Sequence, residues 1–242
     1  MELVIDIGNT RVKAAVFINN GIHTILYTEN ADDELYNKLT QYKIQKVIIS
    51  SVRTDLERVV EFWKSKYSVL VLDHLTPLPI VNTYKTPKTL GKDRIAAVVG
   101  ARFLHEKGPL LSIDIGTCIT YDLLTDDNNY IGGSISPGIE LRYKALHTFT
   151  SALPLGGQKD IDYLYGDDTE TSLSTGVING ITHEIDGFIS AYEEQYPTLK
   201  TLICGGDARY FVKHLKKKIF ANQNLVLLGL HKILLFNEKN LN

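Results

Sequence analysis

The stretch LVIDIGNTRVKAAVF (Leu3–Phe17) consists of two apolar runs separated by Asp-Ile-Gly and a short polar turn. The stretch LLSIDIGTCITYDLL (Leu110–Leu124) repeats this pattern in the second half of the chain. In both stretches an aspartate lies at the end of the first run, and a threonine follows soon after the glycine. Short apolar runs joined by a glycine-containing turn are typical of β-hairpins. We therefore predict the same strand–turn–strand unit twice, each with a carboxylate at its turn.

The elements around each hairpin also follow one order, which predicts two similar halves. In the first half we expect strands at Leu3–Ile7, Arg11–Ile18, Ile22–Tyr27, Lys46–Ser50 and Ser68–Leu72, and helices at Asp32–Leu39, Thr54–Lys66 (N-capped by Thr54) and Asp93–His105. In the second half we expect strands at Leu110–Ile115, Ile119–Leu124, Tyr130–Ser134 and the start of Thr201–Arg209, and helices at Ile139–Thr148, Gly176–Tyr196 and Phe211–Lys217. A boundary near Gly108-Pro109 then divides the chain into an N-terminal domain, 1–108, and a C-terminal domain, 109–242.

Composition excludes several classes of protein. The chain has 242 residues, a formal net charge of −2 and an isoelectric point near 6.4, whereas general nucleic-acid binders carry a basic field. No apolar run reaches the ~18 residues of a membrane-spanning helix. Glu2 and Asp6 interrupt the apolar stretch that a secretory leader would need. Cys118 and Cys204 form no C-x-x-C pair, and we interpret both as small buried hydrophobic residues of a reduced, cytoplasmic protein.

The repeated turn has the chemistry of a phosphate-binding site. A glycine after a strand lets the backbone approach a ligand closely, and Asn9-Thr10 and Thr117 offer amide and hydroxyl donors to phosphate oxygens. Asp6 and Asp114 would repel phosphate directly, so they indicate an intervening cation or metal-bound water. Lys13 adds positive charge. Asp-x-Gly can also be a simple turn signal, but two copies in matching contexts favour a nucleoside triphosphate held by both hairpins.

The segment TYKTPKTLGKDRIAAVVGA (Thr83–Ala101) leads into the third predicted helix of the first half. Asp93 at the head of this helix is a favourable N-cap or first-turn residue. It is also a carboxylate fixed by a rigid helix start, where it could face a substrate hydroxyl group. Arg94 beside it could pair with a carboxylate or phosphate. The residues alone leave both interpretations open.

The paired hairpins resemble the actin, heat-shock-70 and hexokinase superfamily of ATP-binding folds. The resemblance implies an α/β fold of two similar ribonuclease-H-like domains around a nucleotide cleft, each with a phosphate-binding hairpin. In this superfamily a glycine-rich turn of the second domain holds the adenosine. The segment Cys204–Ala208, with Gly205 and Gly206, follows a predicted buried strand and is the candidate for that turn.

A narrower resemblance comes from the motifs in order. They are Asp6-Ile7-Gly8-Asn9-Thr10, Tyr84…Pro87…Gly91-Lys92-Asp93-Arg94, Asp114-Ile115-Gly116-Thr117, Gly132-Gly133-Ser134-Ile135-Ser136-Pro137-Gly138, Thr169…Gly176 and Gly205-Gly206-Asp207-Ala208. Together they look like type III pantothenate kinase, from the first strand to about Arg209. The resemblance implies that pantothenate is phosphorylated by ATP to 4'-phosphopantothenate, the first step of coenzyme A biosynthesis.

This resemblance also assigns roles to residues. It implies an ATP-binding set of Asp6, Ile7, Gly8, Asn9, Thr10, Arg11, Val12, Lys13, Thr117, Gly205 and Gly206. It implies a pantothenate-binding set of Tyr84, Gly91, Lys92, Asp93, Arg94 and Thr169, with Asp93 as the general base. Asp114 matches a position that binds a monovalent cation, potassium or ammonium, and a divalent cation such as Mg²⁺ would accompany ATP. Family members are homodimers, so Thr169 could serve either its own subunit or the neighbouring one.

Two other functions stay open. The first is a kinase of the same fold for another small hydroxylated substrate, such as a sugar. The second is a nucleotide-switched regulatory protein in which hydrolysis drives domain motion. A pure switch would have no need of the Gly-Lys-Asp-Arg helix start at Gly91–Arg94. Release of ADP with pantothenate, with sugars and with no acceptor would separate all three functions.

Overall fold

The computed structural model describes residues 1–53 and 56–238, and these divide into two compact units. The first unit contains Met1–Lys107, Asp127–Ile131 and the chain from Asn224 onward, and the second contains Gly108–Asp126 and Gly132–Gln223. The predicted domain division at Gly108-Pro109 stays a prediction. The last helix, which follows Asn224, belongs to the first of these compact units. Thr54, the expected N-cap, lies outside the described residues. Among those that are described, no helix is both long and apolar enough to span a membrane.

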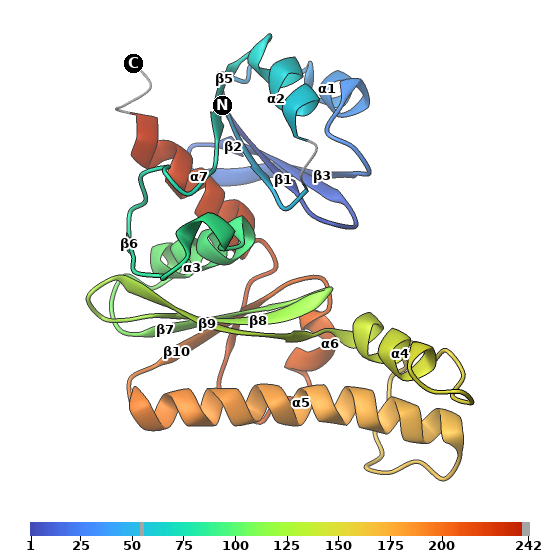
Figure 1. Cartoon of the computed structure of the whole chain (residues 1–242). Coiled ribbons are helices and arrows are strands. Elements are labelled where there is room, and N and C mark those ends of the chain that lie inside the picture. The colour runs from blue at the N-terminus through green and yellow to red at the C-terminus, as the bar shows by residue number, and fades with distance from the viewer. Residues whose placement is uncertain (54–55, 239–242) are drawn as a thin grey trace. The chain divides into compact units, whose positions relative to one another are not determined.

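The first unit is built on a five-stranded sheet in the order β3-β2-β1-β4-β5 (Figure 1). Its strands are β1 (Glu2–Ile7), β2 (Val12–Ile18), β3 (Gly21–Thr28), β4 (Lys46–Ser51) and β5 (Ser68–Val71). Strands β1, β4 and β5 are parallel, while β2 runs antiparallel to both β1 and β3. The central strands β1 and β4 are apolar and mostly buried, as strands covered on both faces must be.

The second unit repeats this arrangement. Its sheet contains β7 (Leu110–Ile115), β8 (Cys118–Leu124), β9 (Asn129–Pro137), β10 (Lys200–Cys204) and β11 (Phe220–Ala221), in the order β11-β10-β7-β8-β9. Residues Asn129–Ile131 of β9 count with the first unit. Strand β7 pairs antiparallel with β8 and parallel with β10, as β1 does with β2 and β4. The two sheets match in strand order and in the direction of the pairs around β1 and β7, which confirms the predicted duplicated α/β fold. A short strand that was not predicted, β6 (Val81–Asn82), pairs with Asn129 and Tyr130 at the start of β9.

Helices cover both faces of the first sheet. On one face, α1 (Asp33–Leu39) and α2 (Glu57–Lys64) enclose alternate residues of β1, and the fully buried Trp63 donates its indole N–H to the carbonyl of Ala31 at 3.0 Å. On the other face, α7 (Leu225–Asn237) contacts β1 and β4, and its His231 stacks on Phe17 with ring centroids 3.9 Å apart. Successive side chains of a strand point to opposite faces of the sheet, so the same strands can pack against α1 and α2 on one face and against α7 on the other.

Helix α3 (Lys92–Leu104) packs on α7 through two glycines. A Cβ atom added at Gly100 would lie 2.2 Å from the carbonyl oxygen of Leu225, and one at Gly229 would lie 1.7 Å from that of Ala96. Only glycine allows backbones to approach this closely. The contact anchors α3, the helix that carries Asp93, to the C-terminal segment of the chain.

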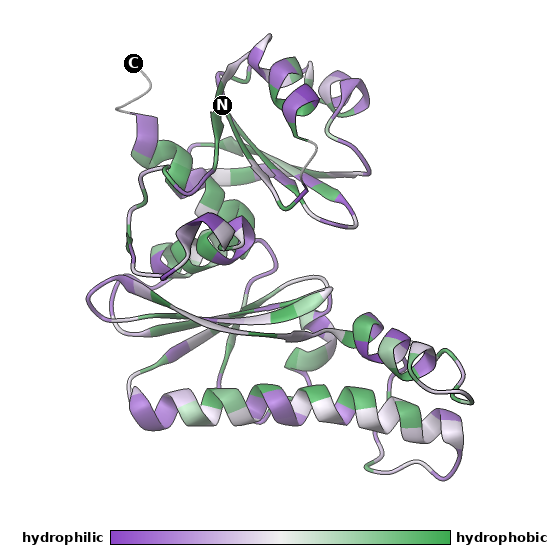
Figure 2. Cartoon of the chain, viewed as in Figure 1, coloured by the Kyte–Doolittle hydropathy of each residue, from purple (hydrophilic) through white to green (hydrophobic). Residues whose placement is uncertain are grey.

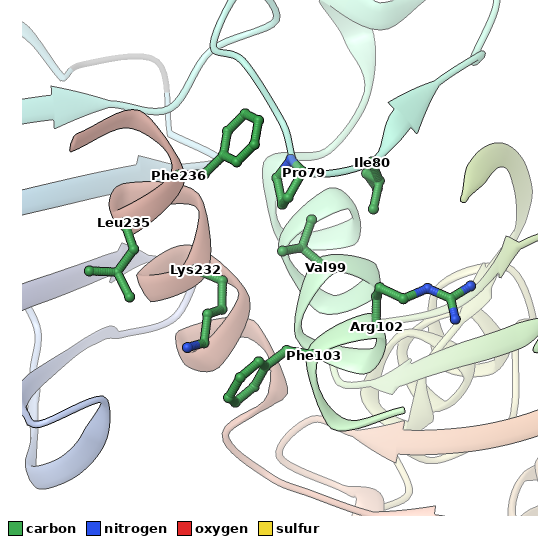
Figure 3. A pocket seen from close by; sticks show the side chains of 8 residues that line it. All are labelled: Pro79, Ile80, Val99, Arg102, Phe103, Lys232, Leu235 and Phe236. Atoms are coloured by element: carbon green, nitrogen blue, oxygen red, sulfur yellow. The ribbon is translucent and has the colours of Figure 1, made fainter. Parts of the chain in front are cut away.

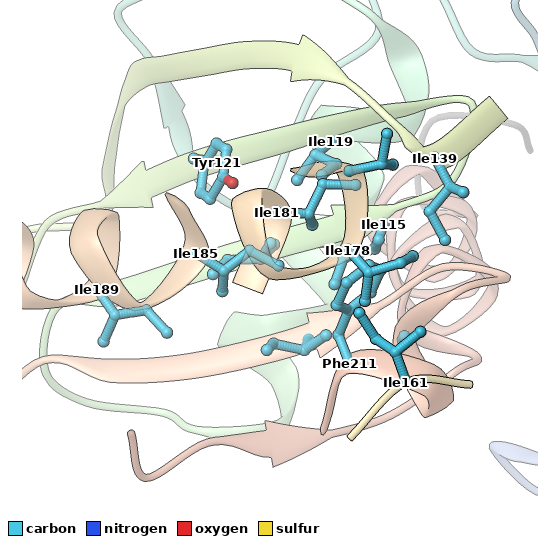
Figure 4. Close-up of a cluster of buried hydrophobic side chains, with 14 of the residues drawn as sticks. Ile115, Ile119, Tyr121, Ile139, Ile161, Ile178, Ile181, Ile185, Ile189 and Phe211 are labelled. Carbon is cyan, nitrogen blue, oxygen red and sulfur yellow. The ribbon is translucent and has the colours of Figure 1, made fainter. Parts of the chain in front are cut away.

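In the second unit the long helix α5 (Thr169–Gln195) runs along one face of the sheet (Figure 1). Ile178, Ile181, Ile185 and Ile189 lie on its buried side and pack against strand residues such as Tyr121 (Figure 4). Figure 2 shows the resulting alternation of apolar and polar residues along this helix. The helices α4 (Ile139–Thr148) and α6 (Ala208–Val212) complete the unit.

Several sequence predictions are wrong in detail. Helix α5 begins at Thr169 and not at Gly176, because Asp168 accepts a hydrogen bond from the Thr171 amide in a capping box. The predicted helix at Phe211–Lys217 is the shorter α6, which begins and ends earlier. Cys118 is exposed, since it begins β8 at the hairpin turn, whereas Cys204 is buried as predicted.

Candidate active site

The first hairpin places the Asp6–Lys13 segment at the end of β1 and the start of β2. Asp6 and Lys13 are cross-strand partners, so their Cβ atoms lie about 5 Å apart on one face of the ladder. The Gly8 amide donates to the carbonyl of Arg11 at 3.1 Å and closes the turn. Asn9, Thr10 and Arg11 are exposed. The turn therefore presents polar donors to solvent beside one carboxylate and one ammonium group.

Arg53, which belongs to none of the sequence motifs, holds this turn through hydrogen bonds to backbone carbonyls. Its Nε donates to the carbonyl of Gly8 at 2.9 Å, and its terminal nitrogens lie 3.5 Å from the carbonyls of Asn9 and Glu29. The Arg53 amide in turn donates to the Ser51 hydroxyl at 2.9 Å. A five-donor guanidinium suits such a role, because it can serve several carbonyls at once.

The start of α3 is joined to the same region of the first unit. Lys92 Nζ donates to the carbonyl of Ser51 at 3.2 Å, so a residue predicted to bind substrate also ties α3 to the end of β4. Asp93 lies in the first helical turn, where its Oδ1 accepts from the Arg94 amide at 2.8 Å. A Cβ atom at Gly91 would lie 2.5 Å from that same Oδ1. Glycine at position 91 therefore leaves room for the Asp93 carboxylate.

Tyr84 and Arg94, both predicted to contact substrate, lie together. The Arg94 guanidinium lies 5.8 Å from the centroid of the Tyr84 ring, within the range of a cation–π contact. Tyr84 is half-buried, and its ring centroid is 6.1 Å from that of Tyr130. The Thr83 amide donates to the Tyr130 carbonyl at 3.0 Å, which continues the pairing of β6 with β9. This pairing fixes Tyr84 over the buried Arg94.

In the second unit, the predicted cation and adenosine residues form one cluster. The Asp207 amide donates to the Ile115 carbonyl at 3.0 Å, so the glycine turn after β10 closes against the end of β7. Gly205 has a φ of +99°, and a Cβ atom there would lie 2.2 Å from the Ile115 carbonyl oxygen and 2.5 Å from Asp114 Oδ1. The structure thus brings Asp114 and Gly205 into direct contact, with Gly206 exposed beside them.

Thr117 lies in the tighter turn of the second hairpin. Here Gly116 donates to the Cys118 carbonyl at 3.0 Å, so this turn is one residue shorter than that from Gly8 to Arg11. Thr117 is exposed, and its carbonyl accepts from the Gly138 amide at 3.0 Å. The Ser-Pro-Gly motif therefore supports the second turn, much as Arg53 supports the first.

Thr169 lies apart from this cluster, at the first residue of α5. It lines a cavity of about 610 Å³ formed by the segment Gly166–Thr169, Leu146, Leu153, and Ser172, Leu173 and Gly176 of α5. None of the other predicted site residues lines this cavity. A second cavity, of about 510 Å³, lies between α3 and α7 in the first unit, and its lining also lacks the predicted residues (Figure 3).

Comparisons with known proteins give the same family that the sequence motifs resemble. A family model described as type III pantothenate kinase matches residues 2–191. The type III pantothenate kinase of Christiangramia forsetii is 46% identical over 98% of this chain and 99% of its own length. That of Bacteroides fragilis is 44% identical over 98% and 99%. The chain belongs to the type III pantothenate kinase family. Its match includes both hairpins and the Gly91–Arg94 segment.

The structural comparison confirms the fold of this family member. The crystal structure of a glucokinase from an Antarctic psychrotroph has a TM-score of 0.53 with this chain, at 13% identity. The alignment covers 98% of this chain and 99% of the glucokinase chain. At such low identity the similarity shows the fold alone, the duplicated architecture of the actin and hexokinase type.

Two contacts that support the family's motifs could not be predicted from the sequence. Arg53 follows β4 in a polar segment without a recognisable motif, and its contacts with Gly8 depend on the parallel pairing of β4 with β1. Gly138 was visible as part of Ser-Pro-Gly, but its contact with the Gly116-Thr117 turn depends on the path of β9. Both contacts join segments far apart in the sequence, so only the folded chain reveals them.

Proposed function

We propose that this protein is an enzyme that transfers the γ-phosphoryl group of ATP to the hydroxyl group of pantothenate. The product, 4'-phosphopantothenate, opens coenzyme A biosynthesis. The observation that carries this proposal is the nearly full-length similarity to type III pantothenate kinases, together with the family match over residues 2–191. A kinase of this family uses ATP with a divalent cation.

In the first unit, Asp93 is proposed to accept the proton of the substrate hydroxyl group. Phosphoryl transfer has a loose transition state, so positioning of the nucleophile matters more than the strength of the base. The first helical turn and Gly91 hold the Asp93 carboxylate in one place. The exposed donors of the Asp6–Lys13 turn would bind phosphate oxygens, with the Lys13 ammonium offsetting negative charge.

Pantothenate itself is a carboxylate with an apolar, hydroxylated body. Arg94 offers a guanidinium that can pair with a carboxylate, and Tyr84 beside it offers an aromatic surface. Gly91 and Lys92 complete this proposed substrate contact. Thr169 is proposed as a further contact, in its own subunit or in the neighbouring one.

In the second unit, the Thr117 hydroxyl is proposed to donate a hydrogen bond to ATP, and Gly205 and Gly206 are proposed to contact the adenosine. The exposed Gly206 supports this assignment, because a flat base or ribose can approach a backbone without a side chain closely, while Gly205 packs the turn against Ile115 and Asp114. A divalent cation bound together with ATP would offset negative charge on the phosphates.

Asp114 is proposed to bind the monovalent cation. The Asp114 carboxylate and the Ile115 carbonyl lie beside the same glycine, and hard oxygen donors of this kind suit an alkali cation. Within the described ranges, no group of three or more His, Cys, Asp or Glu side chains could hold a metal ion. Backbone carbonyls, water or the nucleotide would therefore supply the remaining ligands.

This assignment predicts that activity depends on potassium. We expect turnover in sodium or choline buffer to rise at least about tenfold when KCl is added, since a cation beside the phosphates offsets charge in the transition state. Asp114→Asn should lose this response, while Asp126→Asn, an exposed aspartate of the same unit, should keep it. Equal turnover of the unsubstituted protein with and without potassium would contradict the cation site.

We also propose that the protein is a homodimer located in the cytoplasm. The exposed position of Thr169 at the start of α5 supports a role at a subunit boundary. Light scattering at micromolar concentration should give twice the mass of the 27.1 kDa chain. Neither cysteine, both of them within the described residues, forms a disulfide, which supports a reducing compartment.

The experiment that tests the activity is a coupled assay of ADP release. We expect rapid release with pantothenate, and release near background with glucose or mannose and with no acceptor. Mass spectrometry of the product should show one phosphate added to pantothenate. Release that is equal with and without any acceptor would instead indicate a nucleotide-switched protein, and release with a sugar alone would indicate a different kinase.

A further inference from the structure

Three side chains of the second unit converge on the carboxylate of Glu184, a residue of α5 that no motif includes. Glu184 Oε1 accepts from the Tyr121 hydroxyl at 2.8 Å and from the Ser136 hydroxyl at 2.5 Å. Glu184 Oε2 forms an ion pair with Arg142. The three partners come from β8, β9 and α4. One carboxylate therefore joins four elements of the unit.

This cluster is not an ordinary surface ion pair. The side chains of Arg142 and Glu184 are only 20% and 23% exposed. Partial burial by itself raises the pKa of Glu184, but the hydrogen bonds from Ser136, Arg142 and Tyr121 outweigh it and hold that pKa below its usual value. Glu184 is thus an anion at neutral pH, with strong charge-assisted hydrogen bonds. Such networks fix the geometry of the groups that they join.

The cluster holds the Ser-Pro-Gly motif in two ways. The Ser136 side chain bonds to Glu184 directly, and Arg142 Nε donates to the carbonyl of Pro137 at 2.9 Å. Glu184 in turn orients the Arg142 guanidinium by pairing with its other end. Side chain and backbone of residues 136 and 137 are therefore both fixed immediately before Gly138.

Gly138 connects the fixed Ser136-Pro137 segment to the second hairpin turn. Its amide donates to the carbonyl of Thr117 at 3.0 Å. A Cβ atom at Gly138 would lie 2.0 Å from the Gly116 carbonyl oxygen and 2.8 Å from that of Thr117. The two backbones are thus in direct contact, with no side chain between them that could absorb a displacement. A shift of the Ser-Pro-Gly segment must move the Gly116-Thr117 turn.

We propose that Glu184 is a positioning residue for ATP binding, which acts through Arg142 and the Ser136–Gly138 segment to fix the Gly116-Thr117 turn. The proposal rests on the proposed function of that turn, in which Thr117 contacts ATP. It assigns to a residue in the middle of α5 a role in nucleotide affinity, beyond its contribution to packing.

The test compares Glu184→Gln with Glu193→Gln in the whole protein. Glutamine at position 184 keeps an acceptor for Tyr121 and Ser136 but turns an amide donor toward the Arg142 guanidinium, so the ion pair is lost. Glu193, which also lies on α5, forms an ion pair with Lys217 at 2.8 Å and is not part of the cluster around Glu184. Each variant is measured for equilibrium binding of ATP, for kcat and KM with each substrate, and for its thermal midpoint.

We expect Glu184→Gln to weaken ATP binding and raise the KM for ATP by about tenfold or more, because small displacements of binding groups are costly. The KM for pantothenate should stay within about twofold, since the residues proposed to bind it lie in the first unit, Thr169 excepted. Glu193→Gln should bind ATP as the unsubstituted protein does. A lower thermal midpoint for Glu184→Gln with unchanged ATP affinity would show a structural role only and would overturn the proposal.

A second variant covers the case in which Glu184→Gln does not fold. Arg142→Lys keeps a positive charge for Glu184 but lacks the Nε donor to the Pro137 carbonyl. It should also weaken ATP binding by several-fold, and unchanged affinity would contradict the proposed path. Direct ATP binding decides these outcomes even if the unsubstituted protein fails to phosphorylate pantothenate, in which case the proposed function fails and the positioning role is judged separately.

Discussion

Asp93→Asn is expected to lower kcat by at least about a hundredfold while ATP affinity stays within about twofold. General acid–base groups contribute about 10²–10⁴-fold to turnover. The asparagine Oδ1 can still accept from the Arg94 amide, which Asp93 Oδ1 does at 2.8 Å. The other half of the side chain, however, becomes an amide donor and can no longer accept the proton of the substrate hydroxyl group. The change removes the chemistry and keeps the shape.

The geometry around Asp93 makes this variant a clean probe. Gly91 leaves just enough space for a carboxylate of this size, and asparagine has the same size. The helix start should therefore be unchanged, and so should the Lys92 contact with Ser51 that links it to the end of β4. ATP binding depends on the turns of the two hairpins in our assignment. It should not respond to a neutral isostere at position 93.

The measurement combines steady-state kinetics with direct titration of ATP. Asp33→Asn is the matched control, because Asp33 also lies in the first turn of a helix of the first unit but is exposed and belongs to no predicted site. It should leave kcat unchanged. If Asp93→Asn turns over pantothenate at the rate of the unsubstituted protein, Asp93 has no part in the mechanism.

The sequence predicted the strands better than the helices. Strands β1 and β7 are apolar runs that end in the same Asp-Ile-Gly, and their bounds agree with expectation to within one residue. The predicted start of α5 was wrong because the first turns of this helix are polar. No periodic pattern of apolar residues therefore indicated them. Its true signal was the cap at Asp168 and Thr171. Strand β6 has two residues, too few for any pattern.

The motif residues could be named from the sequence, but their supports could not. Asp114 and Gly205 lie in separate motifs, and their contact follows from the parallel pairing of β7 with β10. Arg53 and Glu184 lie in no motif, since a residue that holds a backbone carbonyl or an arginine can occur at many places. The placement of α7 in the first unit is a further example. The apolar composition of α7 predicts that the helix is buried, but it does not indicate which part of the chain α7 packs against.

The contact between Gly205 and Asp114 makes Gly205→Ala the second variant with a large expected effect. At a φ of +99° an alanine is strained, at a cost of about 1–2 kcal/mol. Its Cβ atom would also lie 2.2 Å from the Ile115 carbonyl oxygen, a backbone atom that can only move with β7. Overpacking of this kind costs about 1–3 kcal/mol more. We expect a loss of about 2–5 kcal/mol in the free energy of unfolding.

The same displacement should abolish the response to ATP. To relieve the overlap, the turn must move away from Ile115 and Asp114, the residues beside which we place the cation and the adenosine. Thermal unfolding with and without ATP measures this directly, because a ligand that binds the folded state raises its stability by RT ln(1 + [L]/Kd). The unsubstituted protein should be stabilised by saturating ATP, and Gly205→Ala should not.

Gly187→Ala is the control for this experiment, since it makes the same chemical change in the same unit. Nothing lies within 4 Å of a Cβ atom at Gly187, which is exposed on α5. Alanine in a helix interior is favoured over glycine by about 1 kcal/mol. This variant should therefore be as stable as the unsubstituted protein or more so, with the full ATP response. If Gly205→Ala also keeps that response, the glycine turn after β10 does not form part of the nucleotide site.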